Sequence, residues 1–271
     1  MKNELTPKNA YNLFKQQSER LLPEATYTHI VPESKQREEL ELLKPTLRYD
    51  RFIFVLDLHN MVIKHAHGIE KMLGYSDKDF TLLKFLQIIH PAHFLTHNIS
   101  ATTMIEGLMH GDWPVEFIKH RYITDICLVH ANKTPYMFKR IGCPFQYDEK
   151  HRLLEYLNEF TLIDEYKEGA PYHIRALHED GSKTWEDDVE KRLSSAFYNE
   201  NLFSDREIQV LRKFAYEDDA SALTISHDLK IERSTVEKFN KRSLQKAFEL
   251  FHVKFNTAKE LGGFLRSQRL L

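Results

Sequence analysis

Residues 229–245, near the end of the chain, restrict the fold more than any other stretch of the sequence. A polar turn at Arg233 and Ser234 separates a short helix from a second helix that begins at Thr235. Apolar or small residues recur every three or four positions on one side of this second helix: Val236, Phe239, Ser243, Leu244 and Ala247. Its other side carries long cations and amides, a pattern that suits either an ordinary solvated surface or the major groove of DNA.

Three further helices are predicted around this one. Ser204 or Asp205 can cap the first helix by accepting hydrogen bonds from its free amides. The second covers residues 220–229, and the last begins near Asn256. The residues of this segment that recur in a known family are Phe203-Ser204-Asp205-Arg206-Glu207-Ile208-Gln209-Val210-Leu211, Ile225, Leu229, Ile231, Thr235-Val236 and Val253. With them, the segment resembles a LuxR-type helix-turn-helix domain. The resemblance implies a four-helix unit whose third helix enters the major groove and whose fourth helix helps it to form a homodimer.

This resemblance gives the polar residues separate predicted roles on double-stranded DNA. Lys238, Lys241, Arg242 and Gln245 are predicted to enter the groove. Arg233, Ser234 and Thr235 stand at the helix start, where free amides favour anions, so we expect them to contact phosphate. Lys230, which precedes this group in the sequence, is predicted to be a further phosphate contact.

Four features depart from the LuxR-type pattern. The loop at residues 217–219 is acidic and lacks the usual glycine. Glu237 stands where a lysine is usual, and Phe239 where a histidine is expected. About four residues, roughly one helical turn, are inserted between Leu244 and Val253. Because phosphate repels a carboxylate, Glu237 must either read a cytosine amino group or pair with Lys241 one turn later. We favour the pairing with Lys241.

The first half of the chain predicts a sheet with helices. Strand-type runs cover residues 51–57 and 61–65, and short helices lead to a longer helix from Pro91. Three more strands follow at residues 117–129, 136–145 and 152–162, with Pro144 indicating a bulge or an early end. The expected fold is an α+β domain with a five-stranded antiparallel sheet and its helices on one face, followed by an all-α four-helix domain.

Short motifs in this region resemble a PAS sensory domain. They are Leu73-Gly74-Tyr75-Ser76, Ile89-His90-Pro91 before a helix, and Phe160-Thr161-Leu162-Ile163-Asp164 after the last strand. The resemblance covers residues 47–166 and implies a domain that receives a small-molecule or protein signal. The flavin-reactive cysteine motif of light-sensing relatives is absent, so no cofactor is assigned.

These two resemblances divide the chain into four parts. Residues 1–46 form a helical leader that packs on the next domain or on a second copy of the protein. Residues 47–166 form the PAS-like domain, and residues 202–271 form the helix-turn-helix domain. Between them, residues 167–201 are expected to be a linker with a connecting helix over 185–197.

Composition and charge exclude several classes of protein. The net charge is −2, but the charge is unevenly distributed. Residues 203–271 have 13 Lys/Arg against 10 Asp/Glu, whereas the rest of the chain has 25 Lys/Arg against 30 Asp/Glu. This asymmetry is the one expected for a basic binding domain joined to an acidic regulatory domain. Cys127 and Cys143 match no metal spacing or disulfide framework, which indicates a reducing, cytoplasmic setting. We find no signal peptide, no membrane-spanning run and none of the common catalytic motifs, so we do not expect an enzyme.

The 15 histidines raise the question of a metal or haem site. His93 and His97 are one helical turn apart and follow His90 closely, a spacing that can hold a divalent ion or haem iron. No carboxylate or thiol stands at a recognised spacing beside them, so we assign no metal. The sequence therefore favours a DNA-binding transcriptional regulator with a PAS sensory domain that controls dimer geometry. Two alternatives stay open: a protein-binding adaptor with a degenerate helix-turn-helix, and a ligand- or haem-binding sensor without DNA output.

Overall fold

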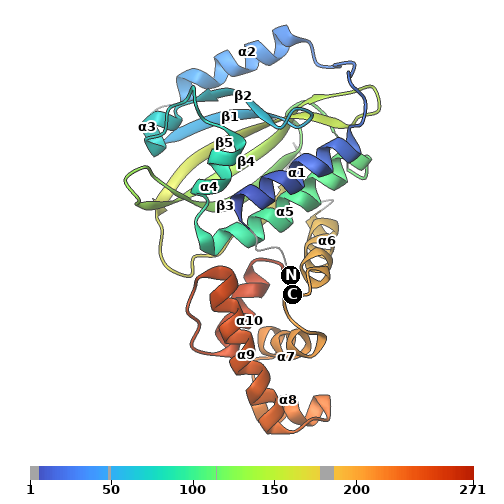
Figure 1. Cartoon of the computed structure of the whole chain (residues 1–271), viewed down its shortest axis with the longest axis vertical. Helices are drawn as coiled ribbons and strands as arrows, with labels where there is room; N and C mark the ends of the chain where they lie inside the picture. The colour runs from blue at the N-terminus through green and yellow to red at the C-terminus, as the bar shows by residue number, and fades with distance from the viewer. Residues whose placement is uncertain (1–5, 48–49, 114, 178–185) are drawn as a thin grey trace.

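The computed structural model describes residues 6–47, 50–113, 115–177 and 186–271. One antiparallel sheet with helices forms the N-terminal part, and a group of helices forms the C-terminal part (Figure 1). The strands are β1 (Arg51–Asp57), β2 (Val62–His67), β3 (Arg121–Val129), β4 (Pro135–Tyr147), β5 (Leu153–Glu165) and β6 (Ile174–Leu177). The helices are α1 (Pro7–Leu21), α2 (Glu33–Leu43), α3 (Ile69–Leu73), α4 (Leu82–Ile88), α5 (Pro91–His110), α6 (Glu186–Asn199), α7 (Asp205–Tyr216), α8 (Ala222–Leu229), α9 (Arg233–Phe251) and α10 (Ala258–Ser267). A short 3₁₀ turn, η1 (Lys44–Thr46), follows α2.

The sheet has six strands in the order β2-β1-β5-β4-β3-β6, so the prediction of five strands is wrong. The additional strand, β6, pairs antiparallel with β3 and lies within residues 167–201, the predicted linker. Its alternation of buried Ile174 and Ala176 with exposed Arg175 is only four residues long. Such a short alternation does not stand out in a polar segment, so periodicity alone does not reveal β6.

Strand β4 carries the irregularity that Pro144 predicted. Its register against β5 shifts between Pro144 and Gln146, because proline has no N–H group to donate to the neighbouring strand. The strand nevertheless continues to Tyr147. Pro144 therefore marks a bulge in this strand.

Helices cover both faces of the sheet, although the sequence predicted them on one face. Phe52, Phe54 and Phe160 point from β1 and β5 into a core shared with α1, α4 and α5, and the rings of Phe52 and Phe160 stack 4.4 Å apart. On the opposite face, a smaller cluster lies under α2 and contains Leu40, Ile53, Val55, Phe145 and Leu157. The leader helices thus pack on the adjacent sheet domain, which is one of the two expected arrangements (Figure 1).

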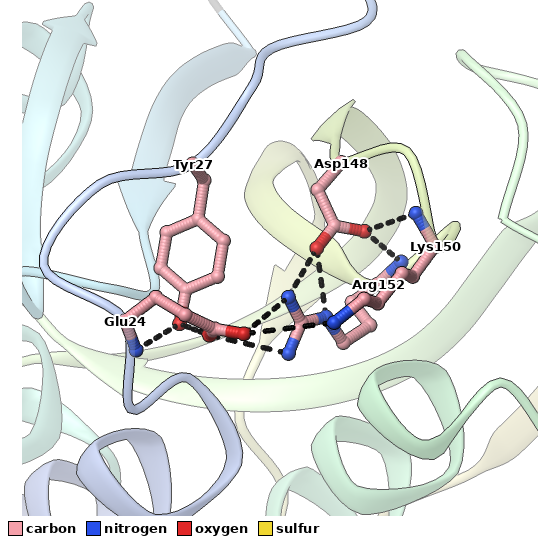
Figure 2. A network of polar contacts seen from close by, with 5 residues as sticks. All are labelled: Glu24, Tyr27, Asp148, Lys150 and Arg152. Atoms are coloured by element: carbon pink, nitrogen blue, oxygen red, sulfur yellow. Dashed lines mark hydrogen bonds and ion pairs between the residues drawn. The ribbon is translucent and has the colours of Figure 1, made fainter.

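A polar network fastens the segment between α1 and α2 to the β4–β5 turn (Figure 2). Arg152 donates to Asp148 at 2.7 Å and to Glu24 at 3.1 Å, and its guanidinium lies 5.1 Å from the ring centre of Tyr27. The Tyr27 hydroxyl also donates to Glu24. Hydrogen bonds from Tyr27 and Arg152 lower the pKa of Glu24 to about 2. Glu24 therefore stays ionised and holds the leader in place at any pH above that value.

The sheet domain and the C-terminal helices share buried contacts. Helix α5 packs against α6 and α9, and α6 covers most of the connecting helix predicted over 185–197, whose first residue, Trp185, lies outside the described residues. After α10, the buried Gln268 makes a hydrogen bond with Thr96 of α5. Arg269 pairs with Glu190 of α6 at 3.3 Å. The end of the described chain is therefore packed between the two parts of the molecule.

Candidate nucleic-acid interface

The candidate interface is built on α7, α8 and α9, which share a small core. Val210 and Phe214 of α7 pack with Ile225 of α8 and Val236 of α9, and Ala258 of α10 closes this cluster. Helix α7 begins at a capping box, in which Ser204 and Glu207 each accept from the other's backbone amide. This confirms the predicted cap at the start of the domain.

The turn between α8 and α9 is short and tightly held. Lys230 ends α8 in the left-handed conformation, with a φ of 52°, and its amide donates to the carbonyl of His227. Helix α9 then begins at Arg233, two residues earlier than predicted, and runs without a break to Phe251. Most of the residues between Leu244 and Val253 therefore belong to α9 itself.

The apolar face of α9 is buried as its sequence pattern predicted. Val236, Ser243 and Ala247 are inaccessible to solvent or nearly so, and Phe239 and Leu244 are partly covered. Because this face is fixed against α7 and α8, the orientation of the opposite face is fixed as well. That face points away from the body of the domain.

The eight predicted DNA-contacting residues lie on the α8–α9 turn and along the outward side of α9. Seven of them are exposed and Thr235 is half-buried: Lys230, Arg233, Ser234, Thr235, Lys238, Lys241, Arg242 and Gln245. Lys238 and Lys241, three positions apart, have no ion pair with any described residue. These two ammonium groups are therefore available to an external anion.

Glu237 pairs with Arg233, so the predicted pairing of Glu237 with Lys241 is wrong. The Nε of Arg233 lies 2.8 Å from a carboxylate oxygen of Glu237, four residues along the same helix. Arg233 and Lys241 each lie one helical turn from Glu237, and in the structure the carboxylate of Glu237 points towards Arg233. As a result, Arg233 is partly neutralised while Lys241 stays free.

Two other predicted contacts are also engaged within the protein. The hydroxyl of Ser234 donates to Glu232 at 3.1 Å, and the amide of Gln245 donates to Glu249 at 3.2 Å. Phe248, which continues the same outward stripe, is 55% exposed. The cationic part of α9 therefore ends before Phe248, and its last two turns are apolar and acidic on this side.

An ion pair that sequence analysis did not predict fixes α9 to α7. Glu207 is fully buried, and Lys246 donates to it at 2.7 Å, while Arg242 lies 3.6 Å away. Burial opposes the ionised form of Glu207, but the hydrogen bonds from Lys246 and Ser204 outweigh it and lower its pKa. Residues 207 and 246 are far apart in sequence, so helical periodicity alone could not reveal the pair.

The acidic loop that follows α7 is tied to its neighbours. Lys213 lies 2.6 Å from Glu217 and 2.8 Å from Asp228, and these two carboxylates raise its pKa. Lys259 of α10 donates to the carbonyl of Asp218. Two lysines therefore offset part of the negative charge of this loop.

The histidines of α5 have roles within the fold. His93 accepts from the amide of Cys127 at 2.9 Å, and its other ring nitrogen bonds the carbonyl of Ala170 at 2.7 Å. His97 contacts the hydroxyl of Tyr172, and His90 caps the start of α5. Burial lowers the pKa of His93 to about 4. Within the described residues, no group of three His, Cys, Asp or Glu side chains is arranged to hold a metal ion.

The two cysteines, Cys127 and Cys143, are free and buried. Burial raises the pKa of each thiol to about 12. Both thiols therefore remain protonated at neutral pH, and the thiolate is the reactive form of cysteine.

Comparison with known proteins gives likenesses of fold only. No protein-family model and no curated protein matches the chain. Among solved structures, the Vibrio cholerae LuxR-type receptor VqmA is 13% identical, with 86% of this chain and 92% of that chain covered and a TM-score of 0.34. A PAS domain from Colwellia psychrerythraea is 16% identical over 47% of this chain and 96% of its own, with a TM-score of 0.35. Escherichia coli SdiA is 14% identical over 96% and 98% of the two chains, with a TM-score of 0.26. No described helix is long and apolar enough to cross a membrane.

Proposed function

We propose that the protein is a sequence-specific DNA-binding transcriptional regulator that acts as a homodimer in the cytoplasm. In this proposal, residues 202–271 bind double-stranded DNA and the sheet domain controls how two such units are spaced. The observation that carries the proposal is the free cationic stripe of Lys238 and Lys241 on the outward face of α9, which is held rigidly by its apolar face. The major groove admits an α-helix, and a helix with exposed cations on its outward side can contact base edges and phosphates there.

The contacts that each predicted residue makes within the protein indicate how much it would contribute to DNA binding. Lys238 and Lys241 are free to reach base edges or phosphate, with Arg242 and Gln245 beside them. Arg233, Ser234 and Thr235 stand at the N-terminal end of α9, where backbone amides attract phosphate, and Lys230 precedes them. To bind DNA, Arg233 must break its ion pair with Glu237, and Gln245 must break its hydrogen bond with Glu249. We therefore expect both residues to contribute less to DNA affinity than Lys238 and Lys241.

A selection from a random duplex pool with the full-length protein tests the proposal. We expect enrichment of a two-fold symmetric site whose half-sites lie about 34 Å, or one turn of DNA, apart. On the enriched duplex, Lys238→Ala plus Lys241→Ala should weaken binding by about tenfold to a hundredfold. The salt dependence should also become shallower by about 0.9 for each phosphate that the variant no longer neutralises.

Lys8→Ala plus Lys78→Ala is the matched control, because it removes the same charge from exposed lysines of the leader and the sheet domain. This variant should bind as the wild type does. Absence of any enriched site, or equal loss of affinity in the two double variants, would refute the proposal. It would instead favour an adaptor whose third helix does not touch DNA.

A further inference from the structure

A cavity lies inside the sheet domain, between the inner face of the sheet and helices α1, α4 and α5. Its volume is about 50 Å³, several times the roughly 10–15 Å³ that one water molecule needs. Most of its wall is apolar, including Leu86 and Phe85 of α4 and Met104 of α5. Three polar side chains from the sheet also line it, Tyr122 of β3, Arg140 of β4 and Tyr156 of β5.

Arg140 is a buried cation without a carboxylate partner. It is 8% exposed, and its Nε and one terminal nitrogen both donate to the same neutral oxygen, Oδ1 of Asn158, at 2.9 and 2.7 Å. It forms no ion pair within the part of the chain that the structure describes. Its guanidinium also lies 5.9 Å from the ring centre of Tyr156, which is an uncharged partner. Since burying a charge without an ionic partner is unfavourable, this position favours an anion beside Arg140.

The side chains around Arg140 offer no such negative charge. Burial lowers the pKa of His97 well below its usual range and raises the pKa of Tyr156 and Tyr122, so these groups are neutral at physiological pH. Tyr122 is 4% exposed, and its hydroxyl makes no hydrogen bond of ordinary geometry with the described residues. The cavity therefore presents a cation that has no carboxylate partner among the described residues, and beside it a hydroxyl group that can donate.

We propose that this cavity binds a small carboxylate with a short apolar chain. The carboxylate would accept hydrogen bonds from Arg140 and Tyr122, which gives the cation an ionic partner and the hydroxyl an acceptor of ordinary geometry. The chain would lie against Leu86, Phe85 and Met104. The volume limits the ligand to a few non-hydrogen atoms, because a cavity that accepts a benzene ring is about three times larger.

The test is calorimetric titration of the full-length protein with acetate, propionate, butyrate and hexanoate at constant ionic strength. Butyramide and 1-butanol have similar shapes without the charge. We expect saturable binding within the carboxylate series and none of butyramide or 1-butanol. Absence of saturable binding for the whole series, or equal binding of butyrate and butyramide, would overturn the proposal.

Two variants locate the site. Arg140→Met removes the charge but retains an apolar chain, and should weaken binding by about a hundredfold. Tyr122→Phe removes one hydroxyl and should weaken binding by about tenfold. Lys139→Met, the matched control, removes a cation from the adjacent position of the same strand and should bind as the wild type does.

If Arg140→Met does not fold, Tyr122→Phe still tests whether the ligand binds at this site. We expect this variant to fold, because it deletes a hydroxyl that makes no hydrogen bond of ordinary geometry with the described residues. Unchanged affinity in Tyr122→Phe together with unchanged affinity or misfolding in Arg140→Met would overturn the assignment of the site. All of these measurements are made without DNA. Failure of this proposal is therefore distinguishable from failure of the proposed DNA binding.

Discussion

The side chain of Thr96 in α5 makes a buried hydrogen bond with the side chain of Gln268, the residue that follows the end of α10. Both residues are inaccessible to solvent, and they are 172 positions apart in the sequence. The bond joins the sheet domain directly to the last residues of the helical domain. The relative position of the two domains is therefore fixed by a specific polar contact as well as by apolar packing.

Replacing Thr96 with valine tests this contact, since the shape is kept and the hydroxyl is removed. We expect the free energy of unfolding to fall by about 1–3 kcal/mol, because Gln268 is left buried without this partner. Urea unfolding followed by far-UV circular dichroism measures the change. Thr102→Val on the same helix is the control, and the double variant Thr96→Val, Gln268→Leu should be destabilised by less than the sum of the single variants. Additive effects would show that the two side chains do not interact.

Glu237→Gln tests the charge balance on α9. The substitution removes a negative charge from the outward face and frees Arg233, so affinity for the selected duplex should rise at low salt. The logarithmic salt dependence should become steeper by about 0.9 if Arg233 then neutralises one phosphate. Titrations at several salt concentrations measure this, with the exposed Glu200→Gln as the control. A weaker complex would mean that Glu237 itself contacts a base.

Acid should loosen the attachment of the leader. The pKa of Glu24 is about 2 in the folded protein, below the ordinary value of 4.5, so its network stabilises the fold fully above pH 4.5. That stabilisation disappears progressively as the pH falls from 4.5 to 2. Glu24→Gln should therefore lower the thermal midpoint at pH 7, and its difference from wild type should shrink towards pH 2. A difference independent of pH would contradict this account, and Glu38→Gln on α2 is the control.

The pair between Glu207 and Lys246 should stabilise the helical domain. Lys246→Met removes the closest cation from a fully buried carboxylate, and we expect the free energy of unfolding to fall by about 2 kcal/mol. This effect is smaller than that for a fully enclosed pair, because Lys246 is partly exposed and Arg242 is still near. Chemical denaturation measures it, with the exposed Lys254→Met as the control. Equal stability of the two variants would show that Arg242 alone is sufficient for Glu207.

Local sequence patterns predicted the elements that depend on local forces. The buried stripe of α9 and the cap at Ser204 follow from helical spacing and free amides, and the structure has both. The two errors in the sheet have non-local causes. Strand β6 exists because Ile174 and Ala176 pair with β3, and α2 covers the second face because Leu40 packs on Ile53 and Val55. Neither interaction is encoded in a local period.

In the candidate interface, too, the sequence predicted the features that depend on local spacing and missed those that depend on tertiary packing. The periodicity of α9 correctly placed Lys238 and Lys241 on its outward face. It could not decide whether Glu237 would turn towards Arg233 or Lys241, since both lie one helical turn away and the choice depends on side-chain conformation. It also could not reveal that Lys246 belongs to a buried pair with Glu207, because that pair depends on how α7 and α9 pack.

Adjacent positions of α5 face two different parts of the molecule. Thr96 bonds Gln268 at the end of the helical domain, whereas His97 lines the internal cavity of the sheet domain. Neighbouring side chains on a helix share one backbone, so a small rotation of α5 displaces both. Under the two proposals, of DNA binding and of a ligand in the cavity, thermodynamic linkage makes any such coupling reciprocal: whatever factor the ligand applies to DNA affinity, DNA must apply to the affinity for the ligand. The concentration at which that ligand fills the cavity would then differ between the free and the DNA-bound protein.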